Sequence, residues 1–227
     1  MKKFFMLFIN LVVPCLVFSL SGGSGFFSFG SSVINIDDFN TFLQNKGYSK
    51  MSDNFVSFGG GGQAVIDNVI IGGEGHGLTG KEEDIGSGYK ASINAGYGFF
   101  NIGYVVLDVG NFNIYPLLGI GGGGIDVKIA ERSQPSFSDI LSNPKRGVEI
   151  NTGGFLLSIS LCTEYLFNLG TSYSANKGGV LLGLRFGYTW SPSYNWMLDG
   201  SSIPGSPNVG INGYFVRLTA GFGGFSY

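Results

Sequence analysis

The sequence predicts an all-β protein: a closed antiparallel up-and-down transmembrane barrel of about eight strands, with one short helix near the N-terminus. Three observations indicate this fold. Large apolar residues alternate with small or polar ones along several stretches, which is the period of a β-strand. Long and short connections alternate between these stretches. Charged residues make up only 12% of the 227 residues, whereas ordinary soluble domains contain about 25%.

The N-terminus has the pattern of an export signal. Lys2 and Lys3 precede an apolar stretch over residues 4–20, and Ser19 and Ser21 place small residues at the −3 and −1 positions of a cleavage site. We therefore expect a signal peptide over residues 1–21 and a single barrel domain over residues 22–227. A permanent membrane anchor is the alternative, and Pro14 within the apolar stretch favours removal.

The first expected elements of the mature chain are a short strand and a helix. The aromatic stretch Gly25–Ile34 predicts a strand. Asp37–Lys46 predicts a helix, because Asn35 or Asp37 can cap its start and Gly47 can end it. A helix this short must dock on the rest of the protein to be stable.

From residue 55 onward the sequence has the pattern of β-strands. The pairs Asp67-Asn68 and Gly110-Asn111 predict two-residue hairpin turns. Further strands, which bring the total to eight, are expected at Phe55–Ile66, Val69–Thr79, Tyr89–Val109, Phe112–Ala130, Glu149–Leu169, Gly179–Trp190 and Asn212–Tyr227.

The connections differ in length at the two ends of such a barrel. Those at one end cover residues 35–54, 80–88, 131–148 and 191–211, and those at the other end cover residues 67–68, 110–111 and 170–178. Long loops on one side and short turns on the other are typical of transmembrane barrels.

The strand Gly179–Trp190 shows the two faces most clearly. Its large residues, which we expect to face lipid, are Val180, Leu182, Leu184, Phe186, Tyr188 and Trp190. The opposite face is mostly small, which suits the narrow interior of an eight-stranded barrel. Aromatic residues also lie near strand ends, where interfacial girdles occur. The alternative is a soluble periplasmic barrel with an apolar ligand cavity lined by Val180, Leu182, Leu184 and Phe186.

The few charged residues on strands are predicted to meet in the lumen. A buried unpaired charge is costly, so these side chains should pair with one another. The expected lumen charge network consists of Glu74, His76, Glu164, Arg185 and Arg217. The functional alternative is a charged constriction that selects small solutes. Cys162, on the same small face, is interpreted as a buried small residue.

Two runs of four glycines, Gly59–Gly62 and Gly121–Gly124, remove side chains from both faces of their strands. They either permit tight curvature or leave space for the helix Asp37–Lys46 or for aromatic side chains.

Other motifs carry no chemistry. Gly75–Lys81 is close to a phosphate-binding loop, but Glu82 replaces the hydroxyl residue that coordinates magnesium. A net charge of −2 without a basic patch gives no reason to expect nucleic-acid binding. We expect no cofactor and no metal ion.

The signal peptide, the alternating strands, the unequal loops and an aromatic C-terminus together resemble the small bacterial outer-membrane β-barrels. Phe225 and Tyr227 match the family's C-terminal signal for the barrel-assembly machinery, although Phe222 stands where the family tends to have glycine. The resemblance implies a location in the outer membrane of a Gram-negative envelope. Members of the family include rigid anchors, adhesion or defence proteins, narrow porin-like channels and a few lipid-modifying enzymes.

The expected function is that of a non-enzymatic integral barrel in outer-membrane lipid, with at most a narrow pore. A surface ligand would be met at loops 131–148 and 191–211, the second of which contains Tyr194 and Trp196. One alternative is a barrel-rim lipid hydrolase that uses His76, which requires a serine hydroxyl within hydrogen-bond reach of the imidazole ring.

Overall fold

The computed structural model describes residues 20–133, 136–142, 147–169, 176–192 and 194–226. Most of the predicted signal peptide (residues 1–19) and Tyr227 lie outside the described residues. Within the described residues neither helix is long and apolar enough to cross a membrane.

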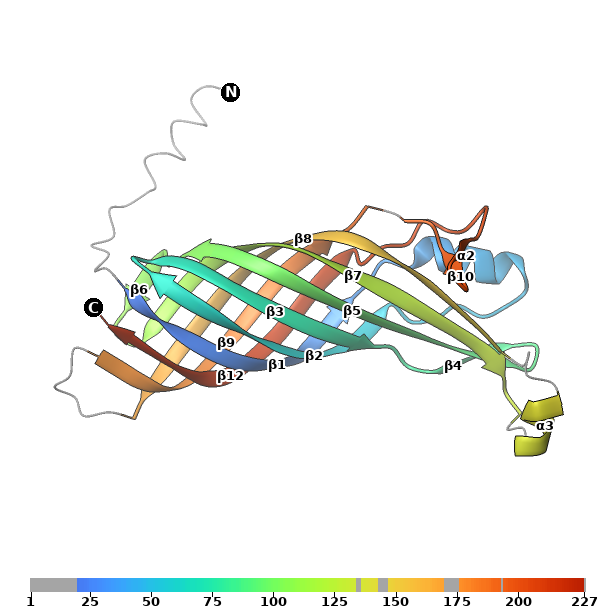
Figure 1. The fold of residues 1–227 in the computed structure, drawn as a ribbon, viewed down its shortest axis with the longest axis horizontal. Helices are drawn as coiled ribbons and strands as arrows, with labels where there is room; N and C mark the ends of the chain where they lie inside the picture. The colour runs from blue at the N-terminus through green and yellow to red at the C-terminus, as the bar shows by residue number, and fades with distance from the viewer. Residues whose placement is uncertain (1–19, 134–135, 143–146, 170–175, 193, 227) are drawn as a thin grey trace, which may run out of the picture.

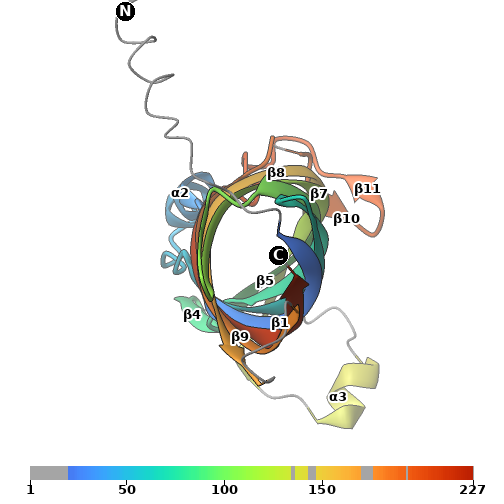
Figure 2. The same ribbon diagram turned by 90° about the vertical axis from the view of Figure 1, so that its left-hand side faces the viewer.

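Eight long antiparallel strands form a closed barrel in the described part of the chain (Figures 1 and 2). Each pairs with the next along the chain, and the last pairs with the first. These strands are β1 (Ser21–Val33), β2 (Asn54–Ile66), β3 (Val69–Thr79), β5 (Tyr89–Tyr104), β7 (Phe112–Glu131), β8 (Gly147–Asn168), β9 (Asn176–Trp190) and β12 (Gly213–Ser226). The predicted fold class is therefore confirmed.

The register fixes the stagger of the barrel. From Trp190 of β9, the cross-strand partners lead once around the ring and return to β9 at Val180, ten residues away. The path runs through Leu157, Ile120, Phe100, Gly73, Gly62, Gly25 and Phe222. This stagger requires strongly tilted strands, as in other small barrels, where the tilt is about 35–45°.

The two-residue turns form where they were expected. Asp67 and Asn68 both have positive φ, at 49° and 69°, as in a hairpin turn that matches the twist of its strands. Gly110 also has a positive φ of 69°. The expected single strand Tyr89–Val109 is wrong, because pairing with β3 ends at Tyr104 and the chain continues as a separate β6 (Leu107–Val109) that pairs with β7 alone.

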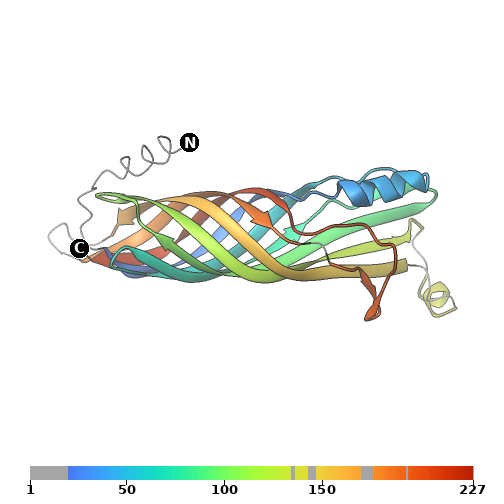
Figure 3. The same ribbon diagram turned by 90° about the horizontal axis from the view of Figure 1, so that it is seen from above.

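Smaller elements gather at the long-loop end of the barrel (Figures 1 and 3). Helix α2 (Asp37–Asn45) starts where the Asn35 side chain accepts a hydrogen bond from the Asp37 N–H, and ends before Gly47, which has a φ of 80°. The other small elements are β4 (Glu83–Gly86), α3 (Phe137–Ser142), β10 (Met197–Leu198) and β11 (Ser201–Ser202).

Among the residues that the structure describes, two apolar clusters lie at different heights in the barrel. The lower cluster, near the short turns, contains Leu20, Val65, Ile70, Val105, Tyr115, Leu117, Cys162, Leu166, Leu181 and Phe225. The upper cluster joins the long-loop end of the barrel to α2 and to loop 191–212, through residues that include Phe39, Leu43, Ile93, Ile125, Val127 and Trp196. Along β3 the order from the short turn upward is Ile70, then Glu74 and His76, then Leu78. A polar layer therefore lies between the two clusters.

Candidate functional site

The polar layer in the lumen is the candidate site, and the alternation of β9 creates it. Arg185 is buried, with 2% of its surface exposed, whereas its neighbours Leu184 and Phe186 are exposed by 44% and 52%. The other large residues of the same face, Val180, Leu182, Tyr188 and Trp190, are half-buried or exposed. The strand thus turns its charge into the barrel and its bulk outward.

Arg185 is at the centre of one half of the layer. Its Nη1 donates to Oε2 of Glu74 at 2.6 Å, and its Nη2 donates to Oε1 of Gln63 at 3.1 Å. Glu164 lies 3.6 Å from the same Nη2 and accepts a hydrogen bond from Nε2 of Gln63 at 3.3 Å. The guanidinium also lies over the ring of Phe26, 4.1 Å from its centroid. Two carboxylates and an amide oxygen therefore surround one buried cation.

Arg217 organises the other half. Its Nη1 donates to Nε2 of His76 at 3.1 Å, its Nε donates to the hydroxyl of Ser57 at 3.2 Å, and its Nη2 donates to the hydroxyl of Tyr97. The second oxygen of Glu74 lies 4.0 Å from Nη1. Glu74 thus joins the two halves, and its layer holds two arginines and two glutamates in balance.

The hydrogen-bond partners of His76 determine which of its two ring nitrogens carries the proton. A guanidinium can only donate, so the Nε2 atom that faces Arg217 must accept. The proton of the neutral ring is then on Nδ1, which lies 3.3 Å from the hydroxyl of Ser28 and donates to it. In this arrangement Nδ1 cannot take a proton from Ser28. The serine that a hydrolase requires is within reach of the ring, but the ring is not oriented as its base.

Inward-facing glycines make room for this layer. A Cβ on Gly59 would lie 2.5 Å from Nδ1 of His76, and one on Gly61 would lie 2.9 Å from Cβ of Glu74. Gly123 leaves room for Tyr97 in the same way. The expectation that the glycine runs leave space for the helix is wrong, since α2 packs at the long-loop end of the barrel (Figure 3). There the ring of Phe39 stacks on Trp196. The space beside Gly123 is instead taken by the aromatic side chain of Tyr97.

The structure brings together all five predicted members of the charge network, Glu74, His76, Glu164, Arg185 and Arg217. Sequence reasoning missed their polar partners, which are Ser28, Ser57, Gln63, Tyr97 and Tyr115. The sequence does contain a signal for Ser57 and Gln63. They are an even number of residues apart on β2 and therefore share its inward face. Tyr97 gave no such signal among apolar neighbours.

Two further residues that the sequence singled out, Cys162 and Phe225, are buried in the interior of the protein. Cys162 is fully buried, 3.7 Å from the hydroxyl of Ser160. Phe225 packs in the lower cluster. Within the described residues no group of three histidine, cysteine or acidic side chains could hold a metal ion.

The aromatic residues of loop 191–211 pack against the protein itself. Trp196 is 1% exposed, and its Nε1 donates to the carbonyl of Pro207 at 2.9 Å. The hydroxyl of Tyr194 accepts the backbone N–H of Phe155 at 2.8 Å. Trp196 is therefore not available to a surface ligand.

No protein-family model matches the sequence, and no curated protein matches it significantly. Two structures of Ail, the attachment invasion locus protein of Yersinia pestis, are similar to the fold. One, in complex with the heparin analogue sucrose octasulfate, has 13% identity and a TM-score of 0.48, and covers 89% of this chain and 98% of its own. The other has 11% identity and a TM-score of 0.46, with coverages of 91% and 99%. The outer membrane protease OmpT of Escherichia coli has 10% identity and a TM-score of 0.27, with coverages of 92% and 95%.

Proposed function

We propose that this chain is a non-enzymatic integral barrel of a bacterial outer membrane that carries helix α2, loop 191–211 and the long β7–β8 hairpin outside the membrane. The distribution of side chains supports the proposal most directly. Phe27, Leu218 and Phe222 are exposed by 79%, 65% and 71%, while two arginines are buried. Soluble monomers rarely expose contiguous apolar patches larger than a few hundred Å². A closed barrel with its large residues outside and its charges inside fits a lipid environment.

The alternative of a soluble barrel with an apolar cavity conflicts with the orientation of β9. Leu182, Leu184 and Phe186 point outward, so they do not line a cavity. Aromatic residues also mark two levels on the outer surface. Trp190 and Tyr214 lie at the long-loop ends of their strands, and Tyr165 and Phe167 lie near the short-turn end of β8. These levels fit the two membrane interfaces.

The lumen supports a sealed barrel rather than a pore. Apolar clusters lie above and below the charged layer, so a continuous path of water would have to pass through both. Ion pairs within the layer leave its arginines engaged with Glu74 and Glu164. The charge network therefore serves to hold the barrel closed.

The hairpin of β7 and β8 favours a role outside the membrane. These strands contain 20 and 22 residues, whereas a transmembrane strand needs about 9–11. At their tip, α3 exposes Phe137 and Leu141, and no residue of this helix is buried. We infer that a surface ligand would be met in the region 131–148.

Two assays test the membrane barrel and its sealed lumen. Protein extracted into detergent and loaded without boiling is expected to migrate faster on a gel than the boiled sample, because the closed barrel stays compact. In planar bilayers we expect no stepwise conductance. Equal migration of boiled and unboiled samples would contradict the barrel in membranes, and steady unitary currents would contradict the seal.

A third assay tests the absence of enzymatic activity. Vesicles of phospholipid with lipid A are incubated with wild-type protein and with His76→Ala, and released fatty acids are measured. We expect equal background release from both. Release that depends on His76 would establish the hydrolase instead.

A further inference from the structure

A groove of about 620 Å³ opens on the outer surface of the barrel where β12, β1 and β2 lie side by side. Its lining combines three outward positions with little or no side chain, Gly25, Gly60 and Ala220, with the rings of Phe27 and Phe222. The volume is within the range of about 300–1,000 Å³ that small-molecule sites occupy. The side chains that line it are apolar.

The register creates the groove. Gly25 pairs with Gly62 on one side and with Phe222 on the other, and Phe27 pairs with Gly60 and Ala220. The rings of Phe27 and Phe222 therefore each have a glycine as a cross-strand neighbour, with no side chain to pack against. This explains why Phe27 and Phe222 are among the most exposed large side chains of the described residues.

Packing within the chain does not require glycine at position 25. A Cβ built on Gly25 would come no closer than 3.9 Å to another atom, the backbone oxygen of Gly61. A larger side chain would project into the groove without disturbing the strand. The space above Gly25 is therefore available to a molecule outside the chain.

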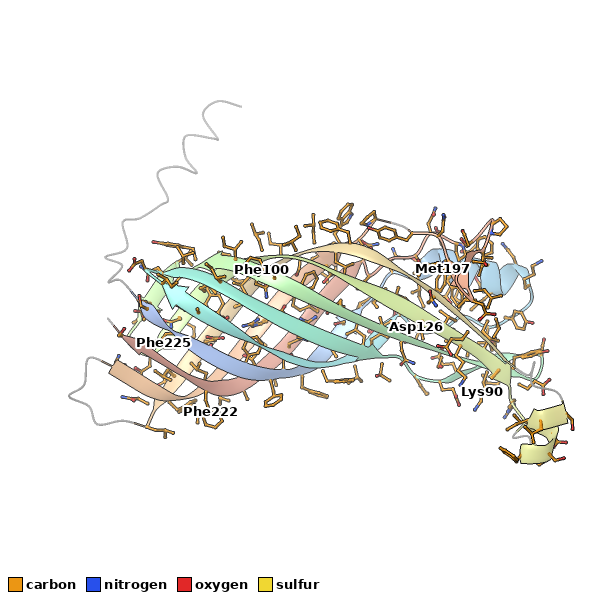
Figure 4. The ribbon with its side chains drawn as sticks, viewed as in Figure 1. Lys90, Phe100, Asp126, Met197, Phe222 and Phe225 are labelled. Carbon is orange, nitrogen blue, oxygen red and sulfur yellow. The ribbon has the colours of Figure 1, made fainter. Side chains whose placement is uncertain are left out.

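The groove lies toward the short-turn end of the barrel. Gly25 is near the start of β1, Phe222 is near the end of β12, and Val180, also in the lining, is near the start of β9. Figure 4 shows Phe222 on the outer surface at this end. Next to the groove, the exposed side chains of Phe29 and Leu218 pair across β1 and β12 and continue its apolar surface along the outside of the barrel. The mouth of the groove therefore opens onto hydrocarbon in the half of the membrane next to the short turns.

We propose that this groove binds one acyl chain of a phospholipid from the membrane half nearer the short turns. The inference rests on the proposed membrane location. A methylene chain is the ligand that this region of the membrane supplies, and it needs no polar partner. Close contact with the backbone at the small residues and with the two rings holds the chain by van der Waals packing, as small residues do between helices in membranes.

The test uses full-length protein inserted into vesicles of phosphatidylethanolamine and phosphatidylglycerol, extracted in mild detergent and analysed by native mass spectrometry. Gly25→Leu fills the groove. The matched control is Gly96→Leu, another outward glycine, on β5, whose Cβ would lie 3.7 Å from the nearest backbone oxygen and whose cross-strand partners are outside the groove lining. Ala220→Phe fills the groove from the neighbouring strand and guards against a folding defect specific to Gly25→Leu.

We expect one phospholipid to stay bound to wild-type protein and to Gly96→Leu, and to be lost from Gly25→Leu and Ala220→Phe. Inserted protein without a bound lipid, or equal retention by all four proteins, would overturn the proposal while leaving the membrane barrel intact. A dimer that Gly25→Leu dissociates would also overturn it, since a second copy would then occupy the groove. Insertion itself is read from heat-modifiable migration, and its failure for wild-type protein would reject the membrane location and the groove ligand together.

Discussion

The inner and outer faces of β9 and β12 have opposite chemistry within a single layer of backbone. Inside, Arg185 and Arg217 are almost fully buried and hydrogen-bonded. Outside, Phe186 and Leu218 are exposed. A soluble barrel has the reverse arrangement, with polar residues outside. On these strands the charged side chains are therefore stabilised in the lumen, where protein groups take the place of water as hydrogen-bond partners.

The long-loop part of β5 and β7 has the ordinary arrangement. Ile93 and Val127 are buried in the upper cluster, while Asn94 and Asp126 are exposed on the outside. Figure 4 shows Lys90 and Asp126 at this end of the barrel. On β5 the outer face therefore changes from polar at Asn94 to apolar at Phe100, and we place the outer boundary of the lipid between these two residues.

The largest expected effect comes from breaking the inner face at Arg185. Arg185→Met leaves Glu74 and Glu164 buried without their main cation, so we expect the free energy of unfolding to fall by about 3–5 kcal/mol. Urea unfolding in phospholipid vesicles, followed by tryptophan fluorescence, measures it. Glu82→Gln is the control, because its pair with Lys90 is exposed and should contribute less than about 1 kcal/mol. Similar losses in the two variants would contradict the buried network.

The next effect comes from giving the outer face a charge. Leu184→Arg places a cation on the lipid side of β9, which should cost about 2–4 kcal/mol near the middle of the membrane. Asn94→Arg is the control, because this exposed position lies above the boundary on β5 and should tolerate arginine with little change. The same unfolding measurement applies. A neutral Leu184→Arg would show that β9 faces water.

The strands could be predicted because their signals are local. Alternation and turn residues placed β3 at Val69–Thr79 without error, and Asp67-Asn68 identified its turn. The break between β5 and β6 could not be predicted, because it depends on where the partner strand β3 ends.

The site could be predicted in part. Alternation along the strands placed Arg185 and Glu74 on inward faces, and the free-energy cost of burying an unpaired charge predicted that they meet. This was possible although 111 residues separate them in the sequence. Their detailed pairing depends on the register of several strands, which no local signal supplies. The rule that large residues face lipid also fails on β5, where Tyr97 and Phe99 point inward. They do so because glycines on β7 leave inner space beside them.

Glycines on the two faces should respond differently to the same small change. Gly123→Ala places a methyl group too close to the backbone oxygen of Gly96 and to Cβ of Tyr97, and this overpacking should cost about 1–3 kcal/mol. Gly98→Ala faces outward, with 3.5 Å to the nearest atom, and should be neutral or stabilising by up to about 1 kcal/mol. Unfolding in vesicles measures both. Equal responses would mean that the inner space is not filled as the structure has it.

The smallest expected effect is a difference in the free energy of unfolding between serine substitutions on the two faces of β1. Ser28→Ala removes the hydroxyl that accepts from His76 in the lumen, and should cost about 0.5–1.5 kcal/mol, the net contribution of a typical hydrogen bond. Ser31→Ala is the matched change on the exposed face, where the hydroxyl makes only a 3.4 Å contact with the carbonyl of Phe55. We expect less than about 0.5 kcal/mol there. A loss at Ser31 as large as that at Ser28 would show that lumen burial adds nothing to a hydrogen bond in this barrel.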